Sequence, residues 1–176
     1  MNDRNRYSDA HIREILSSVR SIAIVGASAN KVRPSYFVTT YMDAKNYQVL
    51  PINPGYGGKE IAGLSTFASL ADLPGPVDMV DYFRKPEFLA EFADQVLAMQ
   101  HLPKVVWMQL GISNEDVAAR LEKAGISVVQ NRCPKIEYAR LCGEIAWCGY
   151  NRRTISSKKP KLKPGYQHFT IGESGV

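Results

Sequence analysis

The chain has 176 residues, three cysteines and a formal net charge of +5, and 45% of its residues are hydrophobic. This length suits one domain with a substantial core, and no apolar run approaches the roughly 20 residues that span a membrane. The charged start MNDRNRYSDAHIREIL is not a secretory signal, so we expect a cytoplasmic protein. An odd number of cysteines without short pairs argues against a disulfide framework and a zinc site, and favours reduced thiols.

The basic excess is confined to residues 151–176. Six basic residues and one acidic residue lie in this stretch, which accounts for the whole net charge. We therefore predict a domain over residues 1–150, followed by a basic, flexible tail over residues 151–176. Because the domain itself is electrically balanced, nucleic-acid or acidic partners are expected only weakly and through the tail.

The predicted elements alternate between helices and strands. In chain order they are a helix over 8–19, a strand over 22–25, a helix over 34–45, a strand over 47–52, a loop over 53–58, a helical turn over 69–74, a strand over 77–83, a helix over 86–99, a strand over 104–109, a helix over 113–125, a strand over 126–130 and a helix over 136–147. Short, uniformly apolar strands between helices are typical of a parallel sheet that is covered on both faces. We therefore predict a three-layer, doubly wound, Rossmann-like α/β fold of five parallel strands in the order 3-2-1-4-5.

The residues that follow the strands are the candidates for a binding site. In a doubly wound sheet, ligands bind at the carboxyl ends of the strands, where the strand order reverses. All five junctions hold small, polar or basic residues, namely Gly26-Ala27-Ser28, Asn53-Pro54, Phe83-Arg84-Lys85-Pro86, Leu110-Gly111-Ile112 and Asn131-Arg132-Cys133. The agreement of five loops favours a nucleotide-type ligand more strongly than any one motif.

The first junction, SIAIVGASANKVRPS over 21–35, has the composition of a phosphate-binding loop. Gly26 permits a tight turn, and a helix that begins at Pro34 offers free N–H groups and the positive end of its dipole. Hydroxyl and basic side chains for a phosphate stand in the same stretch: Ser28, Lys31, Arg33 and Ser35.

The details of these loops disfavour other nucleotide classes. The pattern G-x-G-x-x-G is absent, and the second strand ends in Asn53-Pro54 instead of the acidic residue that holds the ribose of NAD. An NADP site would have to rely on Lys59 or a distant arginine. No G-x-x-x-x-G-K-[ST] occurs, which excludes a P-loop ATPase. An NAD(P)-binding oxidoreductase stays open as an alternative.

The same stretches carry a resemblance to a known family. IAIVGASANKVRPSY, VLPINPGYGGKEIAGLSTFASLADLPGPVDMVDYFRKPE, VVWMQLGI and VVQNRCPKIEY occur in this order. With them the chain resembles the small CoA-binding protein family, which is related to the N-terminal CoA-binding domain of the succinyl-CoA synthetase α subunit. The resemblance covers residues 12–148 and implies a Rossmann-like fold that holds CoA across the strand ends.

The resemblance also implies roles for particular residues. The phosphates would lie along Gly26, Ala27 and Ser28, with Lys31, Arg33, Pro34 and Ser35 beside them. The nucleotide part would lie along Asn53, Pro54 and Lys59, and the adenine or the pantetheine arm between Phe83, Arg84 and Pro86. A further part of the ligand would lie near Gly111 and Ile112, and the thiol end near Asn131 and Cys133. Small members of the family often show Asp-Arg-Cys and a later Glu-His. This chain has Asn131 and Tyr138 at those positions, so no role of that aspartate or histidine is transferred.

These observations predict a protein that binds CoA or an acyl-CoA and has no catalysis of its own. The phosphohistidine domain of the synthetases is expected to be missing, so the chain could instead be an accessory subunit that works with a separate ligase or acyltransferase chain. A homodimer is an alternative assembly. Cys133 is the one candidate reactive group, because the start of a helix, Arg132 and Lys135 would lower the pKa of its thiol. It could form a mixed disulfide with CoA; the alternative is a small buried side chain that packs the loop.

Overall fold

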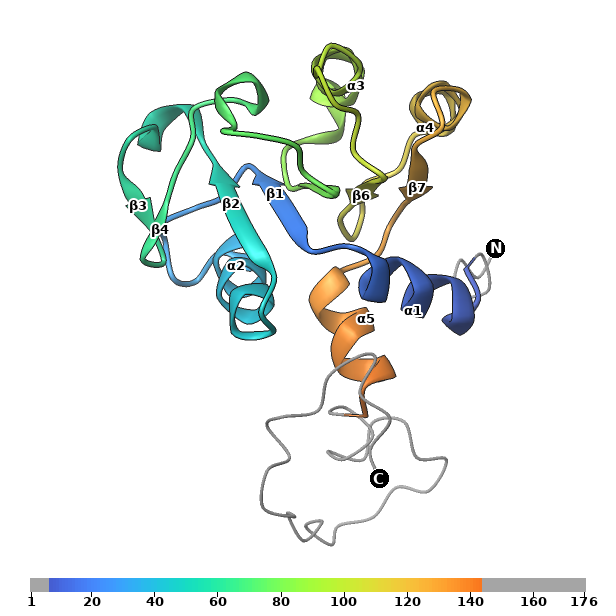
Figure 1. Cartoon of the computed structure of the whole chain (residues 1–176), viewed down its shortest axis with the longest axis horizontal. Coiled ribbons are helices and arrows are strands. Elements are labelled where there is room, and N and C mark those ends of the chain that lie inside the picture. Colours follow the sequence, from blue (N-terminus) through green and yellow to red (C-terminus); the bar gives the residue numbers. More distant parts are fainter. Residues whose placement is uncertain (1–6, 144–176) are drawn as a thin grey trace, which may run out of the picture. The chain divides into compact units, whose positions relative to one another are not determined.

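The structure is a computed structural model, and it describes residues 7–143 (Figure 1). The chain divides into two units: Val19–Cys133, and the two ends of the chain, of which residues 7–18 and 134–143 are described. The predicted tail over 151–176 and the end of the last predicted helix lie outside the described residues. Within the described part, no helix is long and apolar enough to cross a membrane.

Val19–Cys133 is built on a sheet of five parallel strands, as the sequence predicts. The strands are β1 (Ser21–Val25), β2 (Gln48–Ile52), β5 (Met79–Tyr82), β6 (Val105–Met108) and β7 (Ser127–Val129). Every residue of β1, β5 and β6 is buried, which explains why these strands are written as continuous runs of mostly apolar residues.

The order of the strands differs from the prediction. The sheet runs β2-β1-β5-β6-β7, so the order is 2-1-3-4-5 and the predicted 3-2-1-4-5 is wrong in the place of the third strand. The physical reason is Pro51, which lacks an N–H and sits in β2. Its carbonyl oxygen accepts from the N–H of Phe67, so the missing donor faces the outer edge of the sheet. A proline of this kind is tolerated on an edge strand, and the third strand therefore pairs with the other side of β1.

Helices cover both faces of this sheet. In Figure 1, α2 (Pro34–Ala44) lies on one side, and α3 (Leu89–Leu97) and α4 (Glu115–Lys123) lie on the other. The core under α3 and α4 contains large side chains from the sheet and from both helices, namely Val80, Tyr82, Phe92, Val96, Met108, Val117 and Leu121. The helices predicted over 34–45, 86–99 and 113–125 are therefore confirmed, with ends shifted by one or a few residues.

A hairpin between β2 and β5 was not predicted. It consists of β3 (Glu60–Ile61) and β4 (Leu64–Ser65), joined by Ala62 and Gly63, which have φ values of +55° and +78°. Two positive φ values are the signature of a type I′ turn, for which Asn-Gly is the usual sequence. Alanine in the first position hides this turn from sequence analysis. Between β2 and α3, short 3₁₀ helices complete the connections, namely η2 (Pro54–Tyr56), η3 (Leu70–Asp72) and η4 (Pro86–Phe88).

Asp78 ties together the amino ends of three strands. Its carboxylate accepts from the N–H groups of Arg20 (2.7 Å) and Ser21 (3.2 Å), and it pairs with Lys104 Nζ at 2.8 Å. Burial alone would raise the pKa of Asp78, but the hydrogen bond from Lys104 and the two backbone donors outweigh it and leave the pKa lowered. This cluster lies at the edge of the sheet opposite the candidate loops.

The second unit pairs α1 (Asp9–Ser18) with α5 (Pro134–Leu141). Arg140 Nη2 donates to Asp9 Oδ1 and to Glu137 Oε2, both at 2.7 Å. The bond to Arg140 lowers the pKa of Asp9, and the bond to Asp9 raises the pKa of Arg140. The two helices are thus joined by a charged cluster as well as by packing.

Candidate functional site

The five candidate loops gather at one edge of the sheet. All five strands are parallel, so their carboxyl ends share that edge. Residues 26–33 follow β1 and residues 83–86 follow β5, and these two strands are neighbours. Because the strand order reverses between β1 and β5, the topological switch point lies between these two loops.

Gly26 brings the two loops at the switch point into contact. Its φ is +89°, and a Cβ added there would stand 3.2 Å from Cγ of Arg84 and 3.3 Å from Cβ of Phe83. A side chain at this position would therefore be strained by the positive φ and would crowd Phe83 and Arg84. The glycine that the sequence marks as a tight turn is needed for close packing as well.

Hydrogen bonds hold the start of the loop after β1 against the end of β2 and the loop that follows it. The N–H groups of Gly26 and Ala27 both donate to the carbonyl oxygen of Ile52, at 3.0 and 3.2 Å. Asn53 Nδ2 donates to the carbonyl oxygen of Ala27 at 2.7 Å, while Asn53 Oδ1 accepts from the N–H of Gly55 at 2.8 Å. The amide of Asn53 thus shapes the loops, a role that the sequence analysis did not foresee.

The rest of the first loop leads into the start of α2. Ser28 Oγ accepts from the N–H of Asn30, whose own Oδ1 accepts from the N–H of Val32. Arg33 occupies the N-cap of α2 and its side chain makes no capping bond. Pro34 has no N–H, and the N–H groups of Tyr36 and Phe37 donate to the carbonyl oxygen of Arg33 at 3.0 and 3.4 Å, so the N–H of Ser35 is the one that the first turn leaves for an anion within the described residues.

Basic side chains occur in the segments that follow β2, β1 and β5. Arg84 stands over the ring of Phe88 at 4.9 Å, and Lys59 stands over the ring of Tyr56 at 5.8 Å. Together with Lys31 and Arg33 they make four exposed cations, and none of the four pairs with a carboxylate within residues 7–143. Lys85, by contrast, pairs with Glu87 at 3.3 Å.

The loops after β6 and β7 are joined by Asn131. Its Oδ1 accepts from the N–H of Gly111 at 2.8 Å, and its own N–H donates to the carbonyl oxygen of Ile112 at 3.0 Å. Asn131 has φ +53°, a left-handed conformation that asparagine tolerates better than most residues. Ile112 and Cys133 are each only 8% exposed, whereas Leu110 is 57% exposed. The burial of Cys133 favours the packing alternative over a reactive thiol.

A buried polar pair beneath these loops was missed by the sequence analysis. Asp81 in β5 is fully buried, and Gln109, directly after β6, donates from Nε2 to both of its carboxyl oxygens at 2.9 and 3.0 Å. Burial raises the pKa of Asp81 to about 8. An aspartate inside the apolar run Met79–Tyr82 is the sequence signal that could have pointed to this pair.

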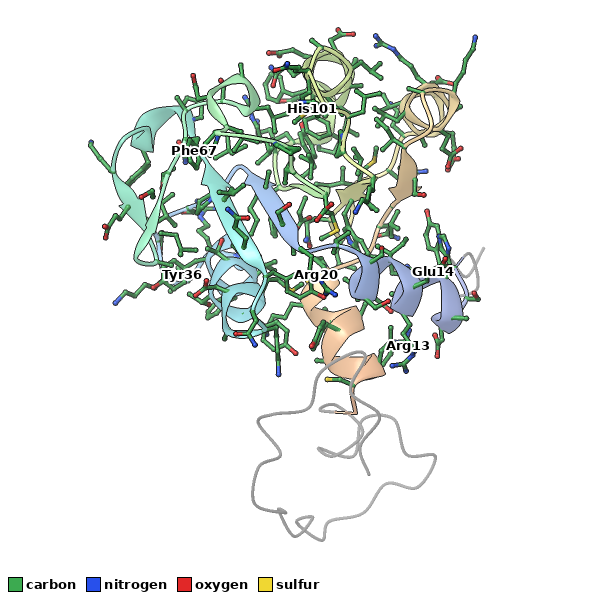
Figure 2. The ribbon with its side chains drawn as sticks, in the orientation of Figure 1. Arg13, Glu14, Arg20, Tyr36, Phe67 and His101 are labelled. Carbon is green, nitrogen blue, oxygen red and sulfur yellow. The ribbon has the colours of Figure 1, made fainter. Side chains whose placement is uncertain are left out.

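A hollow elsewhere on Val19–Cys133 does not suit a charged ligand. It has a volume of about 760 Å³ and is lined by residues 69–71, 73–76, 95 and 98–101, between η3 and the end of α3. His101, labelled in Figure 2, belongs to its lining, as do Leu70 and Met99. No lysine or arginine lines it, so a ligand with phosphates is expected to bind at the carboxyl ends of the strands instead.

A doubly wound sheet whose switch point combines a close-packed glycine, the start of a helix and exposed cations defines a Rossmann-like domain of the nucleotide-binding type. Comparison with known families agrees: the family model of the CoA binding domain matches residues 20–139. The chain therefore belongs to the CoA-binding domain family.

Individual relatives support this assignment. Protein YneT of Bacillus subtilis (strain 168) is 34% identical over 132 residues, which are 75% of this chain and 95% of YneT. A solved structure from Thermus thermophilus is 40% identical with a TM-score of 0.72, and the match covers 77% of this chain and 99% of the other. The dinucleotide forming acetyl-coenzyme A synthetase 1 of Ca. Korarchaeum cryptofilum, at 21% identity and a TM-score of 0.50, shares the fold alone; 62% of this chain matches 25% of that one.

Proposed function

We propose that the protein binds CoA or an acyl-CoA at the carboxyl ends of the strands, without catalysis of its own. The observation that carries this proposal is the set of exposed cations in the loops after β1, β5 and β2, which have no carboxylate partner among residues 7–143, in a chain of the CoA-binding domain family. A CoA molecule carries a pyrophosphate and a 3′-phosphate, whose negative charges need several cations nearby. Because the domain as a whole is electrically balanced, these cations have to be concentrated at the binding site.

The loops favour one direction for the ligand. Cations and exposed aromatic rings lie after β2, β1 and β5, where Tyr56 and Phe88 are 38% and 36% exposed. Adenine would stack on such rings, and the phosphates would bind the cations beside them. After β6, the exposed Leu110 and the buried Ile112 offer apolar contact instead. The acyl or thiol end is therefore expected over β6 and β7.

The geometry after β2 supports CoA over NAD. The side chain of Asn53 is held by Ala27 and Gly55, which occupies one N–H and one oxygen lone pair of its amide and commits the side chain to shaping the loops. The loop that follows offers Lys59, which suits a phosphate, and no carboxylate occurs among residues 53–59. These features weigh against the oxidoreductase alternative.

Calorimetric titration with CoA, acetyl-CoA, NAD and NADP at one salt concentration tests the proposal. We expect CoA compounds to bind selectively, and Arg33→Ala and Arg84→Ala each to weaken that binding about tenfold, because each removes a charged contact to phosphate. Lys123→Ala, at the far end of α4, is the matched control and should bind as the unaltered protein does. Binding of NADP alone, or of none of the four compounds, would contradict the proposal.

Service as a subunit of an acyl-CoA ligase is a second candidate. It is supported by the acetyl-coenzyme A synthetase, in which the same fold makes up a quarter of a longer chain. A separate chain would then supply the chemistry while this protein supplies CoA. Co-purification of tagged protein with and without CoA tests this candidate, and recovery of the protein alone under both conditions would speak against it.

A further inference from the structure

Asp81 and Gln109 lie directly below the candidate loops. Asp81 is the third residue of β5, and Gln109 is the first residue after β6, the neighbouring strand. The N–H of Gln109 donates to the carbonyl oxygen of Tyr82, the last residue of β5, at 3.4 Å. The pair therefore sits at the carboxyl edge, between the loop over 83–86 and the loop over 110–112.

No ion pair among the described residues accounts for a carboxyl group at this place. Asp81 has no exposed surface, and its register partners are the apolar Ile24 and Trp107. Within the described chain no basic side chain pairs with it. An apolar residue of similar size would avoid the cost of burying a carboxyl group. A second role is needed to explain it.

Gln109 leaves one end of its amide open. Nε2 donates to both oxygens of Asp81, which turns Oε1 away from that carboxyl group. From residues 7–143, no donor reaches Oε1, although Gln109 is only 6% exposed. Buried polar atoms usually have a partner, as the indole N–H of Trp107 does in the carbonyl oxygen of Arg132 at 2.9 Å. The missing partner is expected to come from a ligand.

Other polar groups of the site are already occupied. The N–H of Gly111 is taken by Asn131, and both ends of the Asn53 amide bond to backbone. The pantetheine arm of CoA contains two amide groups, each with an N–H and a carbonyl oxygen. Such an arm, running over β6, can supply a partner to either end of the Gln109 amide.

We propose that Asp81 is a positioning residue, which orients Gln109 so that the open end of its amide bonds an amide of the ligand's pantetheine arm. This inference rests on the proposed function and adds a recognition element for the arm, separate from the cations that hold the phosphates.

Comparison of CoA with adenosine 3′-phosphate 5′-diphosphate tests the inference, because this nucleotide keeps every phosphate and lacks the arm. We expect Gln109→Met to bind CoA about tenfold more weakly and the nucleotide unchanged. Asp81→Asn should lower CoA affinity less, since an amide can still hold Gln109 in either orientation. The double variant Asp81→Leu, Gln109→Met removes both polar side chains of the pair, so neither is left buried without the other, and it should lose the same tenfold in CoA affinity.

The control is Asp78→Asn at the opposite edge, which should lower the melting temperature without changing the ratio of the two affinities. In the unaltered protein, the side-chain amide NMR signal of Gln109 should shift with CoA and stay in place with the nucleotide. An unchanged affinity ratio in the double variant, or an unshifted signal, overturns the inference. If neither compound binds the unaltered protein, the proposed function itself fails and the inference falls with it.

Discussion

At the scale of single residues, Asp78, directly before β5, and Asp81, within β5, respond to burial in opposite ways. Asp78 is surrounded by donors and its pKa is lowered, whereas Asp81 has one amide and the N–H of Tyr82, and burial raises its pKa to about 8. The first carboxylate strengthens the fold as an ion. The second is tolerated mainly in its neutral form.

A pH dependence of stability follows from Asp81. An unfolded aspartate has a pKa of about 3.9, so between that value and about 8 the folded protein holds a proton that the unfolded chain releases. The free energy of unfolding should therefore fall as the pH rises through this window and level off above it. Urea unfolding at a series of pH values measures this slope.

Asp81→Asn should flatten the slope, because asparagine does not titrate. The stabilisation from Asp78 behaves in the opposite way and is lost as the pH falls through its lowered pKa, so the variant should keep its loss of stability in acid. An equal slope in the variant and the unaltered protein would show that Asp81 is ionised in the fold.

At the residue scale, the sequence predicted the loops and not their internal bonds. Gly26 and Pro34 were found because backbone geometry restricts the residue types there. The pairing of Asp81 with Gln109 depends on the register of β5 and β6, which no local pattern reveals. The locking of Asn53 onto Ala27 depends in the same way on two loops meeting in space.

At the scale of elements, apolar runs predicted every strand of the five-stranded sheet. The strand order was wrong because Pro51 was not weighed: in the order 3-2-1-4-5, the second strand would have a partner on both sides, and proline cannot donate to one of them. The hairpin of β3 and β4 was missed because its strands have two residues each and its turn begins with alanine.

The turn of this hairpin predicts a stabilising substitution. Ala62 has φ +55°, a left-handed conformation that costs an L-residue with a Cβ about 1 kcal/mol. Ala62→Gly should remove this cost and raise the midpoint of urea unfolding. As a control, Ala90→Gly on the exposed side of α3 should lower the midpoint by a similar amount, since glycine weakens a helix. A lower midpoint in both variants would contradict the turn assignment.

At the scale of the whole molecule, charge separates the predicted tail from the domain. Residues 151–176 carry the entire net charge, while the proposed ligand site lies within Val19–Cys133. A chain that ends at residue 150 should bind CoA as the full chain does and lose its retention on a polyanionic heparin column. Loss of CoA binding in the shortened chain would show that the tail belongs to the ligand site.

The proline of β2 has one more consequence, for how the protein can associate. An exposed sheet edge invites a strand from another chain, but the outer side of β2 lacks one donor at Pro51 and is already met by Phe67. The opposite edge, β7, is only three residues long. The sheet is therefore poorly suited to grow by added strands. A partner chain, or a second copy of this protein, is expected to dock through helices or loops. Its strands are not expected to pair with the strands of this sheet.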